Sequence, residues 1–281
     1  MAIKYDLSAI DMIKLLGCRE PVGREDREEI RKRYDPSLPM DKTRLEHFQE
    51  EYHQTIPPML YEFLSLANDH PLFETADIWA AGSCLLYFSY EDIEERIEDD
   101  RDYWEEAPED CVDDEYYQFS QIPKEQWKES VLNYLYIGSD YAAGVVNFGI
   151  CETDLDKENP PVYYLHEAGS IKDWKVIADT LSDFLGGIVC DVLSGVEYST
   201  AQDYLEEEDG GWEFSESGYN SEEELRKQLA QQQIDLSKMK KYPSFYGEED
   251  SYRCCADEEA GTLYLTKNGK ELLVIQKVEY P

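Results

Sequence analysis

The chain has 281 residues, of which 63 are acidic and 26 basic, and its formal net charge is −37. A charge of this size repels phosphate groups, so the composition argues against direct binding to nucleic acid and against an anionic membrane surface. Hydrophobic residues make up 42% of the chain and aromatic residues 13%, which is enough for a packed core and excludes a wholly disordered chain.

The cysteines and the first residues bear on the cellular compartment. The chain has 7 cysteines at wide spacings and no C-x-x-C pair, which predicts free thiols in a reducing compartment rather than a disulfide framework. No secretory signal is recognisable at the start, and no stretch approaches the roughly 18 apolar residues of a membrane helix. We therefore expect a cytoplasmic protein without a membrane partner. Cys254 and Cys255 fall in a predicted strand, which would turn one side chain inward and the other outward.

Helical patterns come first along the chain. Residues 7–16 predict a short helix, and residues 24–34 predict a charged helix with acidic and basic side chains at helical spacing. A third helix is expected from Thr43, where the sequence T-R-L-E fits a capping box. Residues 59–67 predict a fourth helix, with Pro58 in its first turn.

Strand patterns follow, rich in β-branched and aromatic residues and bounded by turn signals. The expected strands are residues 83–90, 132–138, 144–150 and 161–167. Residues 178–194 then predict a helix with two glycines in its middle, Gly186 and Gly187, each weakening it by about 1 kcal/mol.

The last part of the chain differs in composition. Residues 197–220 are polar and predict a linker with local structure, and residues 221–233 predict a surface helix with Ser221 as its N-cap. Asn268-Gly269 lies between two strand-like runs, which predicts a terminal β-hairpin. The expected organisation has three parts: an N-terminal helical extension over 1–40, a domain over 41–196, and an extension of acidic linker, helix and hairpin over 197–281.

The densest acid lies in residues 91–115, which hold 15 Asp or Glu and 2 Arg. A disordered spacer would be poor in aromatic residues, whereas this run contains or adjoins several. Aromatic rings supply buried area and carboxylates supply steering, so the run predicts a contact surface for a basic partner. The alternative is a solvated, charged helix face followed by a loop. The candidate partner-binding residues are Glu98, Asp99, Asp100, Asp102, Tyr103, Trp104, Glu105, Glu106, Asp113, Asp114, Tyr116 and Tyr117.

Catalytic and metal motifs are missing from the sequence, so we predict no catalytic residues, no cofactor and no metal site. The remaining nucleophile hypothesis pairs His166 with Cys84 or Cys151. A loop beginning at Asp154 has acidic residues at positions 1, 3 and 5, as in a calcium loop. Its positions 6 and 12 lack the required Gly and Glu, so a solvated hairpin loop is expected instead.

Several short motifs occur in a characteristic order. They are Leu45 to Ile56-Pro57, Phe63-Leu64-Ser65-Leu66-Ala67-Asn68, Ile137-Gly138-Ser139-Asp140, Pro161-Val162-Tyr163-Tyr164 and Ser182-Asp183-Phe184-Leu185. In this order and spacing the chain resembles the SUKH superfamily of Smi/Knr-type domains. The resemblance implies an α+β fold: a central, mostly antiparallel sheet flanked by helices, here with N-terminal helical and C-terminal β-hairpin additions.

The same resemblance implies a function. Many bacterial SUKH members are immunity proteins that bind and silence a toxin, often a nuclease, and fungal members look like regulatory modules. The first hypothesis is therefore a non-enzymatic immunity protein that neutralises a basic toxin domain through its acidic surface. A general interaction module of the same fold is the second, and a small-molecule hydrolase on an unrelated α+β fold is the third.

Overall fold

The computed structural model describes residues 3–16, 50, 55–67, 84–86, 134–140, 146–166, 174–194, 212–243 and 251–277. The chain divides into two compact units. One comprises Met40–Leu64 and Ser83–Leu181, and the other comprises Met1–Pro39, Ser65–Gly82 and Ser182–Pro281. Among the helices of these described residues, none is both long and apolar enough to cross a membrane.

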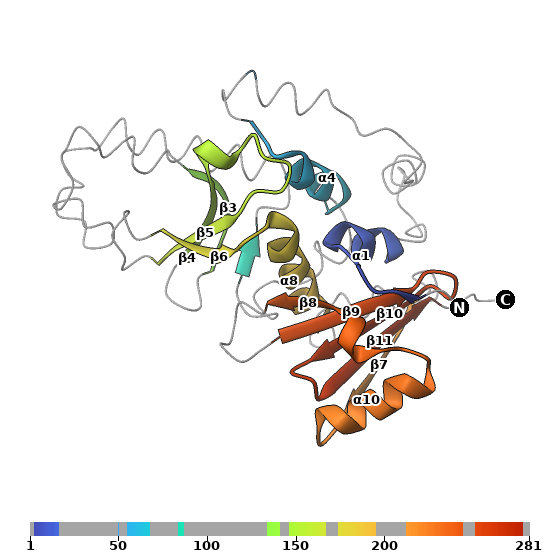
Figure 1. The fold of residues 1–281 in the computed structure, drawn as a ribbon. Helices are drawn as coiled ribbons and strands as arrows, with labels where there is room; N and C mark the ends of the chain where they lie inside the picture. The colour runs from blue at the N-terminus through green and yellow to red at the C-terminus, as the bar shows by residue number, and fades with distance from the viewer. Residues whose placement is uncertain are drawn as a thin grey trace. The chain divides into compact units, whose positions relative to one another are not determined.

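The first unit holds an antiparallel sheet in the order β2-β3-β4-β5-β6 (Figure 1). Its strands are β2 (Cys84–Leu86), β3 (Tyr134–Asp140), β4 (Val146–Cys151), β5 (Val162–His166) and β6 (Lys175–Ala178). Because side chains alternate along a strand, one face of this sheet carries Leu135, Phe148, Ile150 and Val162, none more than 2% exposed. This face is the apolar core of the unit.

Helix α4 (Pro58–Ala67) begins at a proline, whose fixed φ suits the first turn of a helix. Leu60, Tyr61 and Phe63 are each at most 2% exposed, so the helix is anchored by one apolar side. The predicted helix at 59–67 is confirmed.

The second unit is built on a six-stranded antiparallel sheet in the order β1-β9-β10-β11-β7, with β8 also paired to β9. Its strands are β1 (Ile3–Lys4), β7 (Trp212–Gly218), β8 (Lys240–Pro243), β9 (Ser251–Asp257), β10 (Thr262–Lys267) and β11 (Glu271–Lys277). The helical elements of the unit are α1 (Ala9–Leu15), α8 (Leu181–Ser194), α10 (Glu222–Gln231) and the short η6 (Leu236–Lys238). Residues near the two ends of the chain thus share one sheet, because Ile3 pairs with Asp257.

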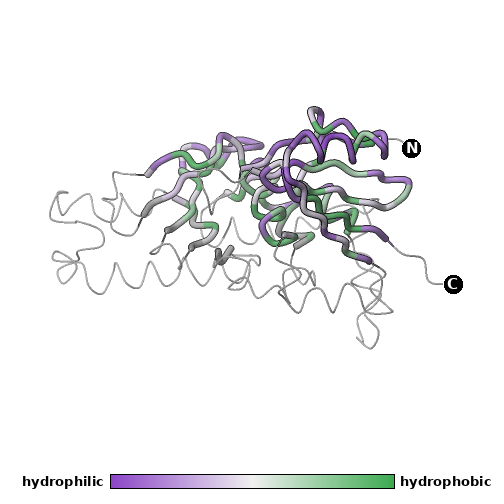
Figure 2. Tube along the Cα trace, turned by 90° about the horizontal axis from the view of Figure 1, so that it is seen from below, coloured by the Kyte–Doolittle hydropathy of each residue, from purple (hydrophilic) through white to green (hydrophobic). Residues whose placement is uncertain are grey.

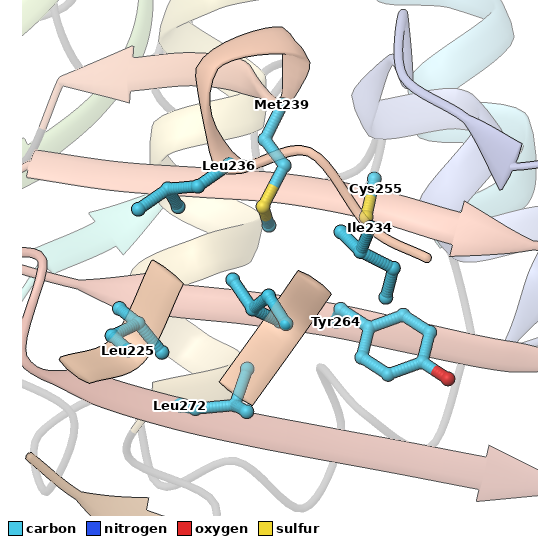
Figure 3. Packing of buried hydrophobic residues seen from close by; sticks show 8 residues of the cluster. Leu225, Ile234, Leu236, Met239, Cys255, Tyr264 and Leu272 are labelled. Atoms are coloured by element: carbon cyan, nitrogen blue, oxygen red, sulfur yellow. The ribbon is translucent and has the colours of Figure 1, made fainter. Parts of the chain in front are cut away.

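One face of the second sheet is covered by α10 and η6. Leu225 and Leu229 of the helix are fully buried in a cluster with side chains from the strands (Figure 3). The cluster consists of Leu225, Leu229, Ile234, Leu236, Met239, Cys255, Tyr264 and Leu272. Hydrophobic and hydrophilic stretches alternate along the trace (Figure 2), as expected for a chain whose elements bury only part of their surface.

The opposite face of the second sheet packs against α8. Every residue of this helix from 184 to 193 is buried, which is typical of a helix apolar all round. Gly186 lies directly against the ring of Tyr242, and a Cβ atom there would come within 2.0 Å of the ring carbon Cε1. Gly186 is therefore required for close packing, which sequence propensity alone could not show.

Several sequence predictions are confirmed. The α+β class and the antiparallel sheet are correct, and α1, α10 with its Ser221 cap, and strands β3, β4 and β5 lie where expected. Both turn residues of the terminal hairpin have positive φ, 55° at Asn268 and 64° at Gly269, as the Asn-Gly motif predicts. The expected helix at 24–34 lies outside the described residues, and of the one expected from Thr43 only Glu50 is described, which is helical.

Other predictions need correction. The helix expected from residue 178 begins at Leu181, and strand β6 ends at Ala178 just before it. A short apolar run next to a helix is too short for its periodicity to distinguish strand from helix. Part of the presumed linker is strand β7. Cys254 and Cys255 are both fully buried, since each face of the second sheet is covered. The terminal hairpin itself is present as predicted, and its strands β10 and β11 belong to the six-stranded sheet.

Candidate partner-binding surface

Three aromatic rings form a cluster on the first sheet. The rings of Tyr134 and Trp174 are stacked, with centroids 4.1 Å apart and planes inclined by 12°. The ring of Tyr163 meets Tyr134 edge-on, with centroids 5.6 Å apart and planes inclined by 71°. Both geometries are favourable for aromatic pairs and fix the rings relative to one another. We call these three residues the ring cluster.

The ring cluster lies on the face opposite the apolar core of its sheet. Tyr134 is adjacent to the core residue Leu135, and Tyr163 to the core residue Val162, so both point to the other side. Trp174 reaches over Gly149 of β4, where an added Cβ would lie 3.3 Å from its ring carbon Cη2. The glycine leaves room for the indole to lie close to the strand.

An acidic loop, which we define as residues 152–158, borders the ring cluster. It holds four carboxylates and one lysine, and it follows β4 through the short helix η4 (Glu152–Asp154). Leu155, only 5% exposed, anchors the loop. Glu152, Asp156 and Glu158 are exposed.

Asp154 connects the acidic loop to the ring cluster. The Tyr163 hydroxyl donates a hydrogen bond to its Oδ2 at 3.2 Å, and the Lys157 ammonium forms an ion pair with its Oδ1. The side chain of Asp154 is 11% exposed, which is low for a carboxylate and is compensated by these two donors. Both of its carboxylate oxygens are thus engaged by protein groups.

The two phenols of the cluster remain protonated near neutral pH. Burial, with a smaller contribution from Cys151, raises the pKa of Tyr134 to about 12. Burial and the charge of Asp154 also raise the pKa of Tyr163. The hydrogen bond to Asp154 raises the pKa of Lys157, which therefore stays charged. The cluster thus provides rings and hydroxyl donors, and no phenolate base.

An exposed apolar side chain extends the same surface. Val176 of the edge strand β6 pairs with Tyr163, so the two share one face of the sheet. Its exposure is 50%, and among the described residues it is the one large hydrophobic side chain that is exposed. Its neighbour Lys175 alternates to the other face. Ring cluster, acidic loop and Val176 together make a surface with apolar centre and acidic border.

The twelve partner-binding residues predicted from the sequence, between Glu98 and Tyr117, lie outside the described residues, so their role stays a prediction. The ring cluster was missed by sequence reasoning. Its signal was available in part, because Tyr134 and Tyr163 lie in predicted strands rich in aromatic residues. Trp174 was assigned to no element, and stacking across strands distant in sequence depends on register.

Strand register bears on the nucleophile hypothesis. His166 pairs with Val146 at the start of β4, whereas Cys151 is the last residue of that strand, which separates their backbones by about 16 Å at ~3.3 Å per residue. Cys84 lies in the same row as His166 but three strands away, about 14 Å at ~4.8 Å per strand. Neither cysteine is adjacent to the histidine in the sheet.

Comparison with known families decides the classification. The model of the SMI1 / KNR4 family (SUKH-1) matches residues 39–187, a little more than half of the chain. The chain belongs to this family. All five strands of the first sheet and the ring cluster lie inside the SUKH-1 match, whereas strands β7 to β11 lie beyond it. No curated protein and no solved structure matches the chain.

Proposed function

We propose that this SUKH-1 protein is a cytoplasmic immunity protein that neutralises a basic, nuclease-type toxin domain by binding it, without catalysing a reaction. The observation that carries the proposal is the combination of SUKH-1 membership with a net charge of −37. A nuclease presents Lys and Arg where it grips phosphate, and a carboxylate-rich protein surface matches that charge.

The proposed mechanism is electrostatic capture followed by close contact. Complementary charge can raise association rates from about 10⁵–10⁶ M⁻¹s⁻¹ for neutral pairs towards 10⁸–10⁹ M⁻¹s⁻¹ at low salt. Affinity then depends on a few desolvated aromatic anchors rather than on total charge. The acidic run supplies the steering in this proposal, with Tyr103 and Trp104 as anchors within it.

The test needs a candidate partner, which is a basic, nuclease-type toxin domain encoded by a gene found next to that of this chain, purified and assayed for its activity. Wild-type protein should inhibit it at a one-to-one ratio. Changing Asp99, Asp100 and Asp102 to Lys should slow stopped-flow association by at least about tenfold, because steering of this kind contributes roughly 10–10³-fold to the rate.

A matched control reverses three exposed acids of the second unit, Glu213, Glu223 and Glu271, and so changes the net charge equally. If both triple variants slow association to the same extent, the effect belongs to overall charge and the acidic run is a solvated face. If wild-type protein leaves the toxin active, the immunity function is wrong.

A second candidate is a general interaction module of the same fold. The second unit favours it, because its strands β7 to β11 lie outside the family match and a toxin antagonist of SUKH-1 type need not have them. The two functions differ in one result, since an interaction module would bind its partner without suppressing a toxic activity.

A further inference from the structure

The core of the first sheet does not need the ring cluster. Leu135, Phe148, Ile150 and Val162 already fill the core face and are essentially inaccessible. The rings stand on the reverse face, where half-buried aromatic residues are not required to complete a core. Rings that are rigidly held, partly exposed and placed outside the core are the usual anchors of a protein interface.

The acidic loop beside the ring cluster favours a positively charged group at this surface. Glu152, Asp156 and Glu158 are exposed in the adjoining loop, whose net charge is −3. The loop's single cation, Lys157, is already paired with Asp154. A positively charged group that approaches the surface therefore meets uncompensated carboxylates at its border.

The chemistry of the surface distinguishes between cations. A guanidinium is planar, weakly hydrated, stacks on aromatic faces and forms two parallel hydrogen bonds with a carboxylate. An ammonium is compact and strongly hydrated, so it gains less from rings. Val176 adds an exposed apolar patch against which the methylene stem of an arginine can pack.

We propose that the ring cluster, Val176 and the acidic loop form a docking surface for an arginine-bearing segment of a partner protein. This deepens the proposed function, on which it rests for the identity of the partner, by placing a contact site on the SUKH-1 sheet itself. The rings hold the guanidinium groups, and the exposed carboxylates of the loop pair with them.

The test uses two synthetic peptides, (Gly-Arg)6 and (Gly-Lys)6, titrated into the full chain at 150 mM NaCl. The arginine peptide should bind about fivefold more tightly, because a cation–π contact of about 1 kcal/mol corresponds to that ratio. The indole NH resonance of Trp174, assigned with Trp174→Phe, should shift during the arginine titration.

Val176→Arg places a like charge on the surface without entering the core, so folding should survive. It should raise the Kd of (Gly-Arg)6 by at least about tenfold, since juxtaposed like charges in an interface cost several kcal/mol. The matched control is Ser217→Arg, the same charge change at an exposed strand position of the second unit. It should change the Kd by less than about twofold.

Equal weakening by both variants, an unshifted Trp174 resonance, or equal binding of the two peptides would overturn the docking surface. These failures are separable from failure of the proposed function. A toxin still neutralised by Val176→Arg would keep the immunity function and remove this contact site. If the wild-type protein leaves the toxin active while the arginine peptide still shifts the Trp174 resonance, the docking surface stands and the immunity function is wrong.

Discussion

For the substitution Gly186→Ala, helix propensity and the packing seen in the structure predict opposite changes in the free energy of unfolding. Propensity alone predicts a gain of about 1 kcal/mol, because alanine replaces glycine inside a helix. In the structure, the new methyl group would meet three atoms of the Tyr242 ring at 2.0, 2.5 and 2.5 Å. These distances are far below van der Waals contact, so either the helix or the ring must move.

The ring of Tyr242 has little freedom to retreat. It is fully buried, and its hydroxyl donates a hydrogen bond to the carbonyl of Leu7. Overpacking a core costs about 1–3 kcal/mol, and the overlap of three ring atoms places this case at the upper end. After the propensity gain is subtracted, we expect Gly186→Ala to lower the free energy of unfolding by about 2 kcal/mol.

Urea unfolding followed by circular dichroism measures this change. Gly218→Ala is the matched control, because no atom lies within 4 Å of the position where its Cβ would be, and it should be nearly neutral. In a Tyr242→Ala background the overlap disappears, so Gly186→Ala should become stabilising by about 1 kcal/mol. A stabilising effect of Gly186→Ala in the wild-type background would refute the packing of α8 against β8.

Three further predictions concern local contacts. Asp11→Ala should cost about 1–2 kcal/mol, because Asp11 closes the capping box with Ser8 and pairs with Lys4 at 2.8 Å; urea melts at several pH values measure it. Gly269→Ala should cost about 1–2 kcal/mol, because its φ of 64° disfavours a side chain, and thermal unfolding measures it. Gly149→Ala should displace the Trp174 indole, whose ring carbon Cη2 would lie 3.3 Å from the new methyl group, and change tryptophan emission.

The stability that Asp11 contributes depends on pH, and the direction of this dependence follows from two opposing effects on its pKa. Burial raises its pKa, but hydrogen bonds from Lys4 and Ser8 outweigh burial and bring the pKa below 3.8. The stability it adds is therefore complete above that value and is lost as the pH falls through the lowered pKa. If the stability lost in Asp11→Ala grows as the pH falls, the contacts of Asp11 are wrong. If Gly269→Ala leaves the melting temperature unchanged, the positive φ of the hairpin turn is contradicted. If Gly149→Ala leaves tryptophan emission unchanged, the contact between Gly149 and the Trp174 indole is contradicted.

Local signals were sufficient where one short segment determines its own structure. Ser221 caps α10 through its own hydroxyl, and Asn268-Gly269 supplies both positive φ angles of a hairpin. The apolar and aromatic runs of β3 to β5 mark strands because their residues fit a pleated, half-buried surface. The resemblance to the SUKH superfamily followed from the order of such segments and is confirmed by the SUKH-1 match.

Features that depend on distant partners were not predictable. Strand β7 is polar and pairs with β11 more than fifty residues later, and β1 has only two residues. Cys254 and Cys255 are both buried because helices from different parts of the chain cover the two faces of their sheet, and burial raises the pKa of Cys255 to about 12. The domain limits at 40 and 196 and the acidic contact run stay predictions.

The salt dependence of association between this chain and the toxin domain proposed as its partner tests the central claim most directly. Stopped-flow association rate constants measured from 50 to 300 mM NaCl should fall by at least about tenfold, because exposed charges more than a Debye length apart are screened. A rate constant that stays the same across this range would show that the negative charge does not capture the partner.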